Sequence, residues 1–212
     1  MNLKFFRYLV MKKTTIIIAY LLAVLPLLPA LAQNVRNDQV GVLEAPNATP
    51  WGSWTRAVYC PPGSWAAGYT MKVEPNQGRG DDTALNAVAL YCRDRNGRDV
   101  TRISPHDGFW GSWGEGANCP QGQFLILFNL RVEPSQGSGD DTGANSVAFL
   151  CSNSGGKITE ASNRGQWGSL GEWQGQGLLP GAICGVRAKI EAQQGTGDDT
   201  ALNNLEFTWC RI

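Results

Sequence analysis

Three pairs of adjacent aspartates are the side chains of this sequence with the clearest capacity for chemistry. The pairs are Asp81/Asp82, Asp140/Asp141 and Asp198/Asp199. Two carboxylates beside a threonine and loop carbonyls are oxygen ligands of the kind that calcium takes, although the alternating acids and distal glutamate of an EF-hand loop are missing. Carboxylates also act in pairs in glycoside hydrolysis, where Glu74, Glu133 and Glu191 would be the partners. Because the EF-hand pattern is missing, calcium binding is not favoured. Because no asymmetric acid–base pair is found, catalysis is not favoured either.

Each aspartate pair belongs to a ten-residue motif that occurs three times. The copies are QGRGDDTALN at 77–86, QGSGDDTGAN at 136–145 and QGTGDDTALN at 194–203. Seven of the ten positions are identical in all three, and the copies begin 59 and 58 residues apart. A repeat of this length and spacing indicates three tandem structural units.

The first copy contains Arg79-Gly80-Asp81, the tripeptide that many adhesion ligands present to integrins. The second copy has Ser138 and the third has Thr196 in place of the arginine. Gly-Asp therefore belongs to the repeated motif, and arginine is its variable residue. An adhesion function is disfavoured.

The motif is typical of a tight loop. Its glycines permit positive φ, and short aspartate side chains accept hydrogen bonds from nearby backbone N–H groups. Threonines and asparagines that follow suit the same role: Thr83, Thr142, Thr200, Asn86, Asn145 and Asn203. Because catalysis rarely needs three equivalent centres, the threefold identity favours a structural role for the aspartates.

Strands are predicted on both sides of each motif. Apolar and polar residues alternate with period two, which indicates strands with one buried face. The apolar positions before the motifs are Tyr69, Met71, Val73, Phe128, Leu130, Val132, Val186, Ala188 and Ile190. Those after the motifs are Val88, Leu90, Val147, Phe149, Leu205 and Phe207. On the other face, the three glutamates alternate with Lys72, Arg131 and Lys189, which predicts a solvated face with cross-strand charge pairs.

Segments rich in tryptophan open the units. They read WGSW at 51–54 and 110–113 and WGSL at 167–170. Their repeated placement favours packing in the core or at a sheet edge, and sugar stacking on the indole faces is the alternative, with Trp54 and Trp113 as the candidates. Each unit is thus predicted to be one small antiparallel sheet, and three such sheets bury their apolar faces best around a common axis.

The six cysteines predict three disulfides. Cys60 and Cys92 are 32 residues apart, as are Cys119 and Cys151 at equivalent places, so each pair is expected to bridge within its unit. Cys184–Cys210 is the pair left by elimination, and a one-residue bulge near Trp209 would accommodate it. No C-x₂-C spacing exists, so no zinc site is predicted, and no other cofactor is expected. The single histidine, His106, is expected in a loop.

The N-terminus has the pattern of a signal peptide at residues 1–32. A basic start and an apolar run precede Ala30-Leu31-Ala32, the small-x-small pattern at which signal peptidase cleaves. The remaining residues 33–212 suit a single domain with a full core. They carry 14 Lys/Arg against 18 Asp/Glu, a net charge of −4 that disfavours nucleic acid and anionic membranes as partners. The protein is expected to be secreted and extracellular.

A family resemblance is carried by the stretch KVEP-x-QG-x-GDDTALN, the WGSW openings and a terminal cysteine in each unit. From about Gly41 to Cys210 the sequence resembles the vitelline membrane outer layer protein family. The resemblance implies an all-β fold, a β-prism of three Greek-key sheets of four strands about a pseudo-threefold axis. The repeats would span about 41–93, 100–152 and 158–212. The sequence departs from the pattern in its third cysteine pair and at Leu170.

The resemblance implies a secreted, disulfide-stabilised coat or matrix protein that contacts carbohydrate or glycoprotein. A lectin-like secreted binder is the alternative, and a glycan-acting enzyme is less favoured. Extracellular glycans or glycoproteins are the expected partners, with no membrane partner after signal cleavage, and the protein is expected to be a monomer. No catalytic or metal-binding residue is assigned. The candidate ligand-binding residues are Asp81, Asp82, Asp140, Asp141, Asp198, Asp199, Trp54 and Trp113.

Overall fold

The computed structural model describes residues 36–137, 140–155, 158–159, 161–195 and 198–212. The predicted signal peptide lies outside the described residues, as do Ser138 and Thr196. Gln33–Ile212 forms one compact unit. It is all-β apart from one 3₁₀ turn, η1 (Gln176–Leu178). In the described part of the chain, no helix has both the length and the apolar character needed to cross a bilayer.

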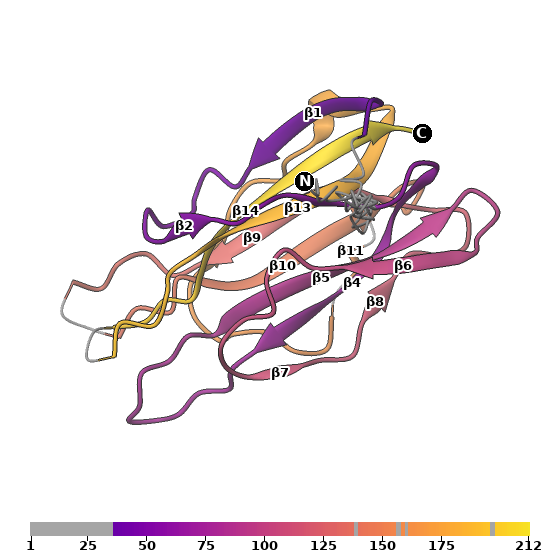
Figure 1. Ribbon diagram of the computed structural model, residues 1–212. Helices are drawn as coiled ribbons and strands as arrows, with labels where there is room; N and C mark the ends of the chain where they lie inside the picture. The colour runs from indigo at the N-terminus through magenta and orange to yellow at the C-terminus, as the bar shows by residue number, and fades with distance from the viewer. Residues whose placement is uncertain (1–35, 138–139, 156–157, 160, 196–197) are drawn as a thin grey trace, which may run out of the picture. The chain divides into compact units, whose positions relative to one another are not determined.

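The strands form three antiparallel sheets (Figure 1). The first sheet has the order β6-β5-β4-β7, and β8 also pairs with β4. Its strands are β4 (Ser64–Val73), β5 (Leu85–Asp94), β6 (Asp99–Ile103), β7 (Ser112–Trp113) and β8 (Ala117–Asn118). Three consecutive strands followed by a fourth that returns beside the first make a Greek key.

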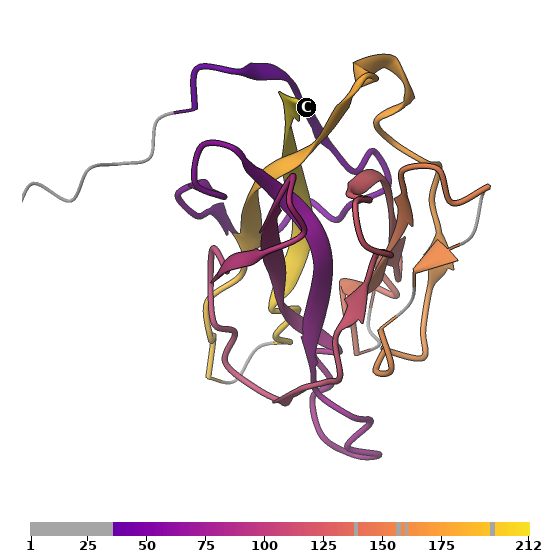
Figure 2. The same cartoon turned by 90° about the vertical axis from the view of Figure 1, so that its right-hand side faces the viewer.

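The second and third sheets repeat this arrangement. The second has the order β11-β10-β9-β12, with β9 (Leu125–Val132), β10 (Ala144–Cys151), β11 (Ile158–Thr159) and β12 (Ser169–Leu170). The third has the order β1-β14-β13-β2, and β3 also pairs with β13. Its strands are β1 (Gln39–Glu44), β2 (Ser53–Trp54), β3 (Val58–Tyr59), β13 (Gly181–Ile190) and β14 (Leu202–Arg211). The three sheets surround one interior (Figure 2), which is the arrangement of a β-prism.

The sheets are out of phase with the sequence repeats, so the expectation of one sheet per repeat was wrong. The tryptophan-rich segment that opens each repeat pairs with the sheet of the preceding repeat: β7 with β4, and β12 with β9. In the first repeat, β2 and β3 pair with β13 near the C-terminus. Because β1 also pairs with β14, the N-terminal strands complete the last sheet and close the ring.

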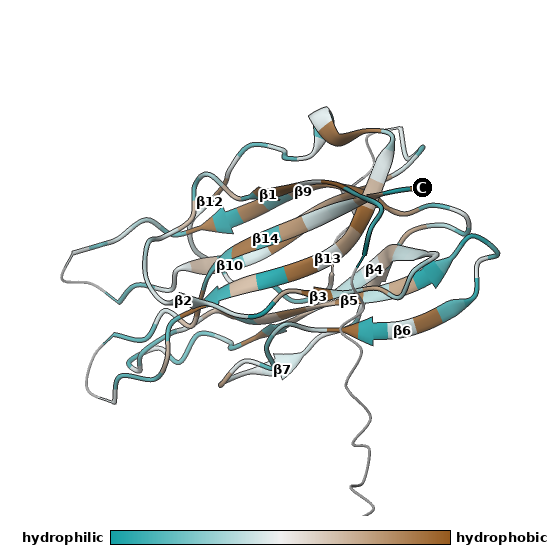
Figure 3. Cartoon of the chain, turned by 45° about the horizontal axis from the view of Figure 1, so that its top comes forward, coloured by the Kyte–Doolittle hydropathy of each residue, from teal (hydrophilic) through white to brown (hydrophobic). Residues whose placement is uncertain are grey.

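The predicted period-two alternation is confirmed. All fifteen apolar positions expected on the inner face belong to one buried cluster shared by the three sheets. Figure 3 shows polar and apolar bands alternating along β13. Aromatic rings join the sheets near the centre: Phe149 lies 4.6 Å from Tyr69 and 5.3 Å from Phe207, measured between ring centroids. Such aromatic pairs add to the free energy gained by burying apolar area.

The three predicted disulfides are present, but two of them join different sheets. Cys60 follows β3 of the third sheet and bonds to Cys92 on β5 of the first sheet. Cys119 follows β8 of the first sheet and bonds to Cys151 on β10 of the second sheet. These bonds therefore hold neighbouring sheets together.

The third disulfide, Cys184–Cys210, lies within one sheet. The bulge that accommodates it lies between Ile183 and Gly185 on β13, opposite the strand of Trp209 rather than on it. The first sheet has a bulge between Ala66 and Gly68 at the equivalent place. The bulge is therefore part of the repeated design, and Cys184 occupies it.

Trp209 stands where the other two repeats have Cys92 and Cys151, and it links the third sheet to the second. Its indole N–H donates to the carbonyl of Ile126 at 2.9 Å, and its ring lies 6.0 Å from that of Phe128. Trp209 is fully buried. A hydrogen bond and ring packing thus take the place of a disulfide between these two sheets.

Candidate functional site

The structure brings the first aspartate of each motif together. Asp81, Asp140 and Asp198 each place one carboxylate oxygen within 4.8 Å of those of the other two. We call them the aspartate ring. Each carboxylate accepts the backbone N–H of the second aspartate of another motif: Asp140 from Asp82 at 3.1 Å, Asp198 from Asp141 at 2.9 Å, and Asp81 from Asp199 at 3.1 Å. The ring therefore links all three repeats to one another.

The second aspartates have a different role from the first. Asp82, Asp141 and Asp199 are buried, and each accepts a backbone N–H from the glutamine that begins its own motif. These hydrogen bonds are 2.6, 2.6 and 2.8 Å long. The second aspartates thus shape their own loops, as the sequence predicts.

The glutamates before the motifs also belong to the loops. Glu74 accepts the hydroxyl hydrogen of Thr83 at 2.6 Å, and Glu133 and Glu191 accept those of Thr142 and Thr200 in the same way. These glutamates and their basic neighbours form no ion pairs among the described residues, because the basic side chains donate to carbonyl oxygens instead. Lys72 donates to the carbonyl of Asp107 at 3.0 Å, for example. A cross-strand charge pair does occur on this face of the third sheet, between Arg187 and Glu206.

The asparagines carry this network into the next repeat. Asn86 donates to the Thr83 hydroxyl at 2.6 Å and accepts the backbone N–H of Trp110 at 3.0 Å. Asn145 accepts the N–H of Trp167 at 3.1 Å, and Asn203 accepts the hydroxyl of Thr49. The repeated polar residues therefore fix each motif to the tryptophan-rich segment of the following repeat, the third to that of the first.

Two carboxyls of the aspartate ring, those of Asp81 and Asp198, have raised pKa values. Partial desolvation, together with hydrogen bonds and repulsion from the neighbouring carboxyls, raises the pKa of Asp198 from 3.8 to about 7. Desolvation also raises the pKa of Asp81. Three facing carboxylates can relieve their repulsion by holding a proton or by coordinating a hard cation through oxygen. The carboxylate of Asp81 accepts a hydrogen bond within the ring. This is not the role that an Arg-Gly-Asp adhesion ligand requires of its aspartate.

The two candidate tryptophans are each covered on one face. The guanidinium of Arg187 lies 4.6 Å from the ring of Trp54, and that of Arg102 lies 4.1 Å from the ring of Trp113. Both contacts have the geometry of a cation–π interaction. At the third equivalent position, Leu170 is 44% exposed.

A groove of 470 Å³ lies between the first and second sheets and is lined by residues of all three repeats. Trp113 and Trp167 line it together with Glu74, Asn163 and Arg164. The side-chain amide of Asn163 donates to the carbonyl of Met71 at 3.0 Å, while its buried Oδ1 accepts no hydrogen bond from any described residue. The groove thus combines aromatic rings with a carboxylate and a guanidinium.

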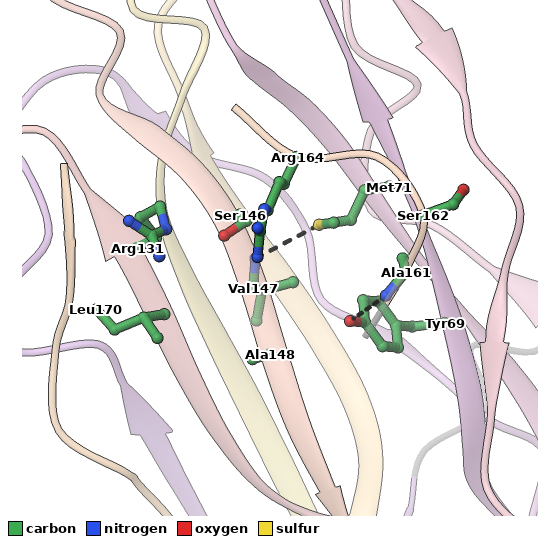
Figure 4. A pocket seen from close by; sticks show the side chains of 10 residues that line it. All are labelled: Tyr69, Met71, Arg131, Ser146, Val147, Ala148, Ala161, Ser162, Arg164 and Leu170. Atoms are coloured by element: carbon green, nitrogen blue, oxygen red, sulfur yellow. Dashed lines mark hydrogen bonds between the residues drawn. The ribbon is translucent and has the colours of Figure 1, made fainter. Parts of the chain in front are cut away.

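A pocket of 380 Å³ adjoins this groove (Figure 4). We call it the β10 pocket, and it is lined by Tyr69, Met71, Arg131, Ser146, Val147, Ala148, Ala161, Ser162, Arg164 and Leu170. It shares Ser162 and Arg164 with the groove, so the two hollows lie on either side of one segment. Sequence reasoning missed both hollows, because they are lined by residues outside the repeated motif.

His106 lies in a loop, as predicted. Its Nδ1 accepts the backbone N–H of Gly108 at 2.8 Å, and its ring packs against Phe109 with the centroids 5.0 Å apart. Burial lowers the pKa of His106. The residue therefore stabilises its own turn.

Comparison with known proteins agrees with the fold and identifies the family. Calsepa lectin in complex with a biantennary N-glycan superposes with a TM-score of 0.53 at 12% identity, covering 84% of this chain and 99% of that chain. Calystegia sepium agglutinin gives a TM-score of 0.53 at 13% identity with the same coverage. At such low identity the likeness shows the fold alone.

The sequence relatives are much closer. Vitelline membrane outer layer protein 1 homolog from Mus musculus is 41% identical over 180 residues, 84% of this chain and 87% of that protein. The homolog from Homo sapiens is 41% identical over 179 residues, 83% of this chain and 86% of that protein. The sequence profile of vitelline membrane outer layer protein I matches residues 41–212. This chain belongs to the vitelline membrane outer layer protein I (VOMI) family.

Proposed function

We propose that this protein is a secreted coat or matrix protein that contacts carbohydrate or glycoprotein outside the cell. Three disulfides suit an oxidising compartment, and they are consistent with an extracellular location. The relatives are named for the outer layer of the vitelline membrane, which supports a role in an extracellular layer. Two of the disulfides join neighbouring sheets, which suits a protein that has to stay rigid outside the cell.

The groove between the first and second sheets is the observation that carries the carbohydrate part of the proposal. An aromatic ring offers an apolar face to a sugar, and a few placed polar groups then fix the orientation of the ligand. Trp113 and Trp167 supply the aromatic surface, while Glu74 supplies an acceptor and Arg164 supplies donors for sugar hydroxyls. The lectins that share the fold lend general support, since one of them is described in complex with an N-glycan.

The proposal is tested by running the oxidised mature protein over a broad glycan array, first with calcium and then with a chelator. We expect binding to a restricted set of glycans, accompanied by a change in tryptophan fluorescence. Asn163→Ala is expected to weaken this binding. Asn47→Ala is the matched control, because Asn47 makes the equivalent hydrogen bond to the carbonyl of Leu130 at 3.0 Å but does not line the groove.

The array also separates the roles of the two candidate regions. Binding that survives chelation places the ligand in the groove and leaves the aspartate ring as a structural link. Loss of binding on chelation would instead make the ring a cation-dependent part of the site. Binding to no glycan in either condition would overturn the carbohydrate proposal and leave a coat protein that contacts other proteins.

A further inference from the structure

The β10 pocket lies over the N-terminal half of β10, before the residues that pair with β11. In the first sheet β6 pairs with β5 from Leu90 to Arg93, and in the third sheet β1 pairs with β14 from Glu206 to Cys210. In the second sheet the described residues of β11 pair with β10 at Phe149 and Leu150. The first residues of β5, β10 and β14 thus lie outside this pairing, but in the first sheet the chain after β6 still bonds to β5, because the Ser104 hydroxyl donates to the carbonyl of Val88 at 3.0 Å.

Tyr69 explains why the chain does not return to β10. Its hydroxyl oxygen accepts the backbone N–H of Ala161 at 3.0 Å (Figure 4). The residues equivalent to Tyr69 in the other repeats are Phe128 and Val186, which have no hydroxyl. In the third sheet, Ala45 instead donates its N–H to Leu205 on β14 at 3.3 Å. The hydroxyl of Tyr69 thus holds the segment around Ala161 away from β10 and opens the pocket.

The polar groups that face the pocket are cationic or neutral. Ser146 is opposite Arg131 in the strand register, and Figure 4 shows it between Arg131 and Arg164. Ser146 is 7% exposed, and its hydroxyl makes no hydrogen bond to a described residue. Arg131 donates from Nη1 to the carbonyl of Gly168 at 2.8 Å, which leaves its other N–H groups for a ligand.

None of the described residues that line the pocket is acidic. The charged side chains described in its lining, Arg131 and Arg164, are both basic, whereas the mature chain has a net charge of −4. The ion pairs among the described residues involve Arg36, Arg93, Arg98 and Arg187, and neither Arg131 nor Arg164 is among them. The two guanidiniums are therefore not neutralised by any described carboxylate.

We infer that the β10 pocket binds the anionic group of an acidic sugar, with Arg131, Arg164 and Ser146 as donors. The inference rests on the proposed carbohydrate contact and names its chemical class. A planar guanidinium matches the geometry of a carboxylate or a sulfate ester, and such charge-assisted hydrogen bonds are the strong ones. Leu170, which is 44% exposed, supplies apolar surface for the sugar ring, and the adjoining groove can take the next ring of an oligosaccharide.

The test compares three sugars that differ in the group at one position. Methyl glucuronide carries a carboxylate where methyl glucoside carries a hydroxymethyl group, and glucose 6-sulfate carries a sulfate ester there. We expect the mature protein to bind the glucuronide, the sulfate ester or both at least about tenfold more tightly than the glucoside, because a hydrogen bond to a charged group contributes about 1.5–3 kcal/mol. The preference should fall as salt is raised, because exposed charges are screened. The two anionic probes together distinguish a carboxylate ligand from a sulfate ester.

The variants locate the anion. Arg164→Ala changes an exposed side chain, so the fold is expected to persist while the preference for the acidic sugar falls about tenfold. Arg131→Gln retains an N–H donor for Gly168 and is expected to lose the preference in the same way. Lys189→Ala is the matched control, since Lys189 is the third-repeat equivalent of Arg131 and lines neither hollow.

The outcomes separate this inference from the proposed function. Equal binding of the acidic and neutral sugars, unchanged by Arg164→Ala, would overturn the anion site while leaving carbohydrate binding in place. A preference for acidic sugars that Lys189→Ala abolishes and Arg164→Ala does not would place the anion elsewhere and also overturn it. Binding of no sugar, on the array or in solution, would overturn both.

Discussion

The aspartate pair shows how two chemically identical neighbours acquire different roles. The second aspartate bonds within its own loop, while the first reaches across to another repeat. The sequence predicts the loop role from turn chemistry, and that prediction is confirmed for Asp82, Asp141 and Asp199. It does not predict the ring, because only the threefold arrangement of the sheets brings Asp81, Asp140 and Asp198 within reach of one another.

The raised pKa of Asp198 makes the stability of the protein depend on pH. The pKa is about 7 in the folded protein against an ordinary value of 3.8, so the folded state favours the protonated carboxyl. The resulting stabilisation is fully present below about pH 4 and is lost as the pH rises through about 7. Asp198→Asn stays neutral, so its stability relative to the natural protein should increase between pH 5 and pH 8. Urea unfolding in the presence of a chelator measures this.

Asp199→Asn is the control for that experiment. It weakens the acceptor of the Gln194 N–H and is expected to lower stability at both pH values. The difference in stability between Asp198→Asn and the natural protein could instead stay constant from pH 5 to pH 8. That result would contradict the raised pKa of Asp198.

The buried threonine of the motif should be sensitive to loss of its hydroxyl. Thr142→Val removes the donor to Glu133 and the acceptor of the Asn145 amide, and both of those groups stay in place. We expect a loss of about 1–3 kcal/mol in the free energy of unfolding, measured by urea denaturation. Thr101→Val, at an exposed position on β6, should change it by less than about 0.5 kcal/mol. Equal effects of the two substitutions would show that the hydrogen bonds of Thr142 to Glu133 and Asn145 do not stabilise the fold.

At the scale of elements, periodicity predicted the long strands and their buried faces well. The fifteen inner-face residues predicted from alternation and from the repeat all lie in the core, because burial of one face leaves that pattern in the sequence. Other core residues, such as Leu125, Ile183 and Leu202, were not predicted. The partners of the short strands were not predicted. β7 and β12 are two residues long, and their sequence carries no signal for which sheet they join. The β10 pocket was missed for a related reason, since it depends on the hydroxyl of Tyr69 redirecting a distant segment.

Trp209 offers a test of how the third and second sheets are joined. Trp209→Phe keeps an aromatic ring but leaves the carbonyl of Ile126 without its indole donor. The free energy of unfolding is expected to fall by at least about 1–3 kcal/mol. Trp110→Phe is the comparison, because the Trp110 side chain is only half-buried and no described residue bonds to its indole N–H. Chemical denaturation that ranks Trp110→Phe as the more damaging change would contradict the role given to Trp209.

At the scale of the whole molecule, the chain closes on itself through its two ends. β1 pairs with β14, and the two disulfides between sheets connect the third sheet to the first and the first to the second. The resemblance to a β-prism family gave the architecture. Two cysteine pairs were predicted from their spacing, and the third was predicted by elimination. The phase shift between repeats and sheets could not be predicted, because a repeat in sequence does not specify which neighbour completes each sheet.

The disulfides between sheets should contribute strongly to stability. Replacing Cys60 and Cys92 together by alanine removes a disulfide between residues that are 32 positions apart in the sequence. The chain-entropy estimate then gives a loss of about 3–4 kcal/mol in the free energy of unfolding. Thermal and chemical unfolding of the double variant would measure it. A loss below about 1 kcal/mol would show that hydrogen bonds and the shared core hold these sheets together without the covalent link.

The most direct test of the carbohydrate site is a nuclear magnetic resonance titration of the isotope-labelled mature protein with the tightest glycan found on the array. We predict that the backbone amide shifts concentrate at Ser146, Ala148 and Arg164 and at the groove residues Trp113 and Asn163, because these residues line the two adjoining hollows. Shifts confined to the opposite end of the sheets, or no shifts with any glycan, would contradict carbohydrate binding at this site.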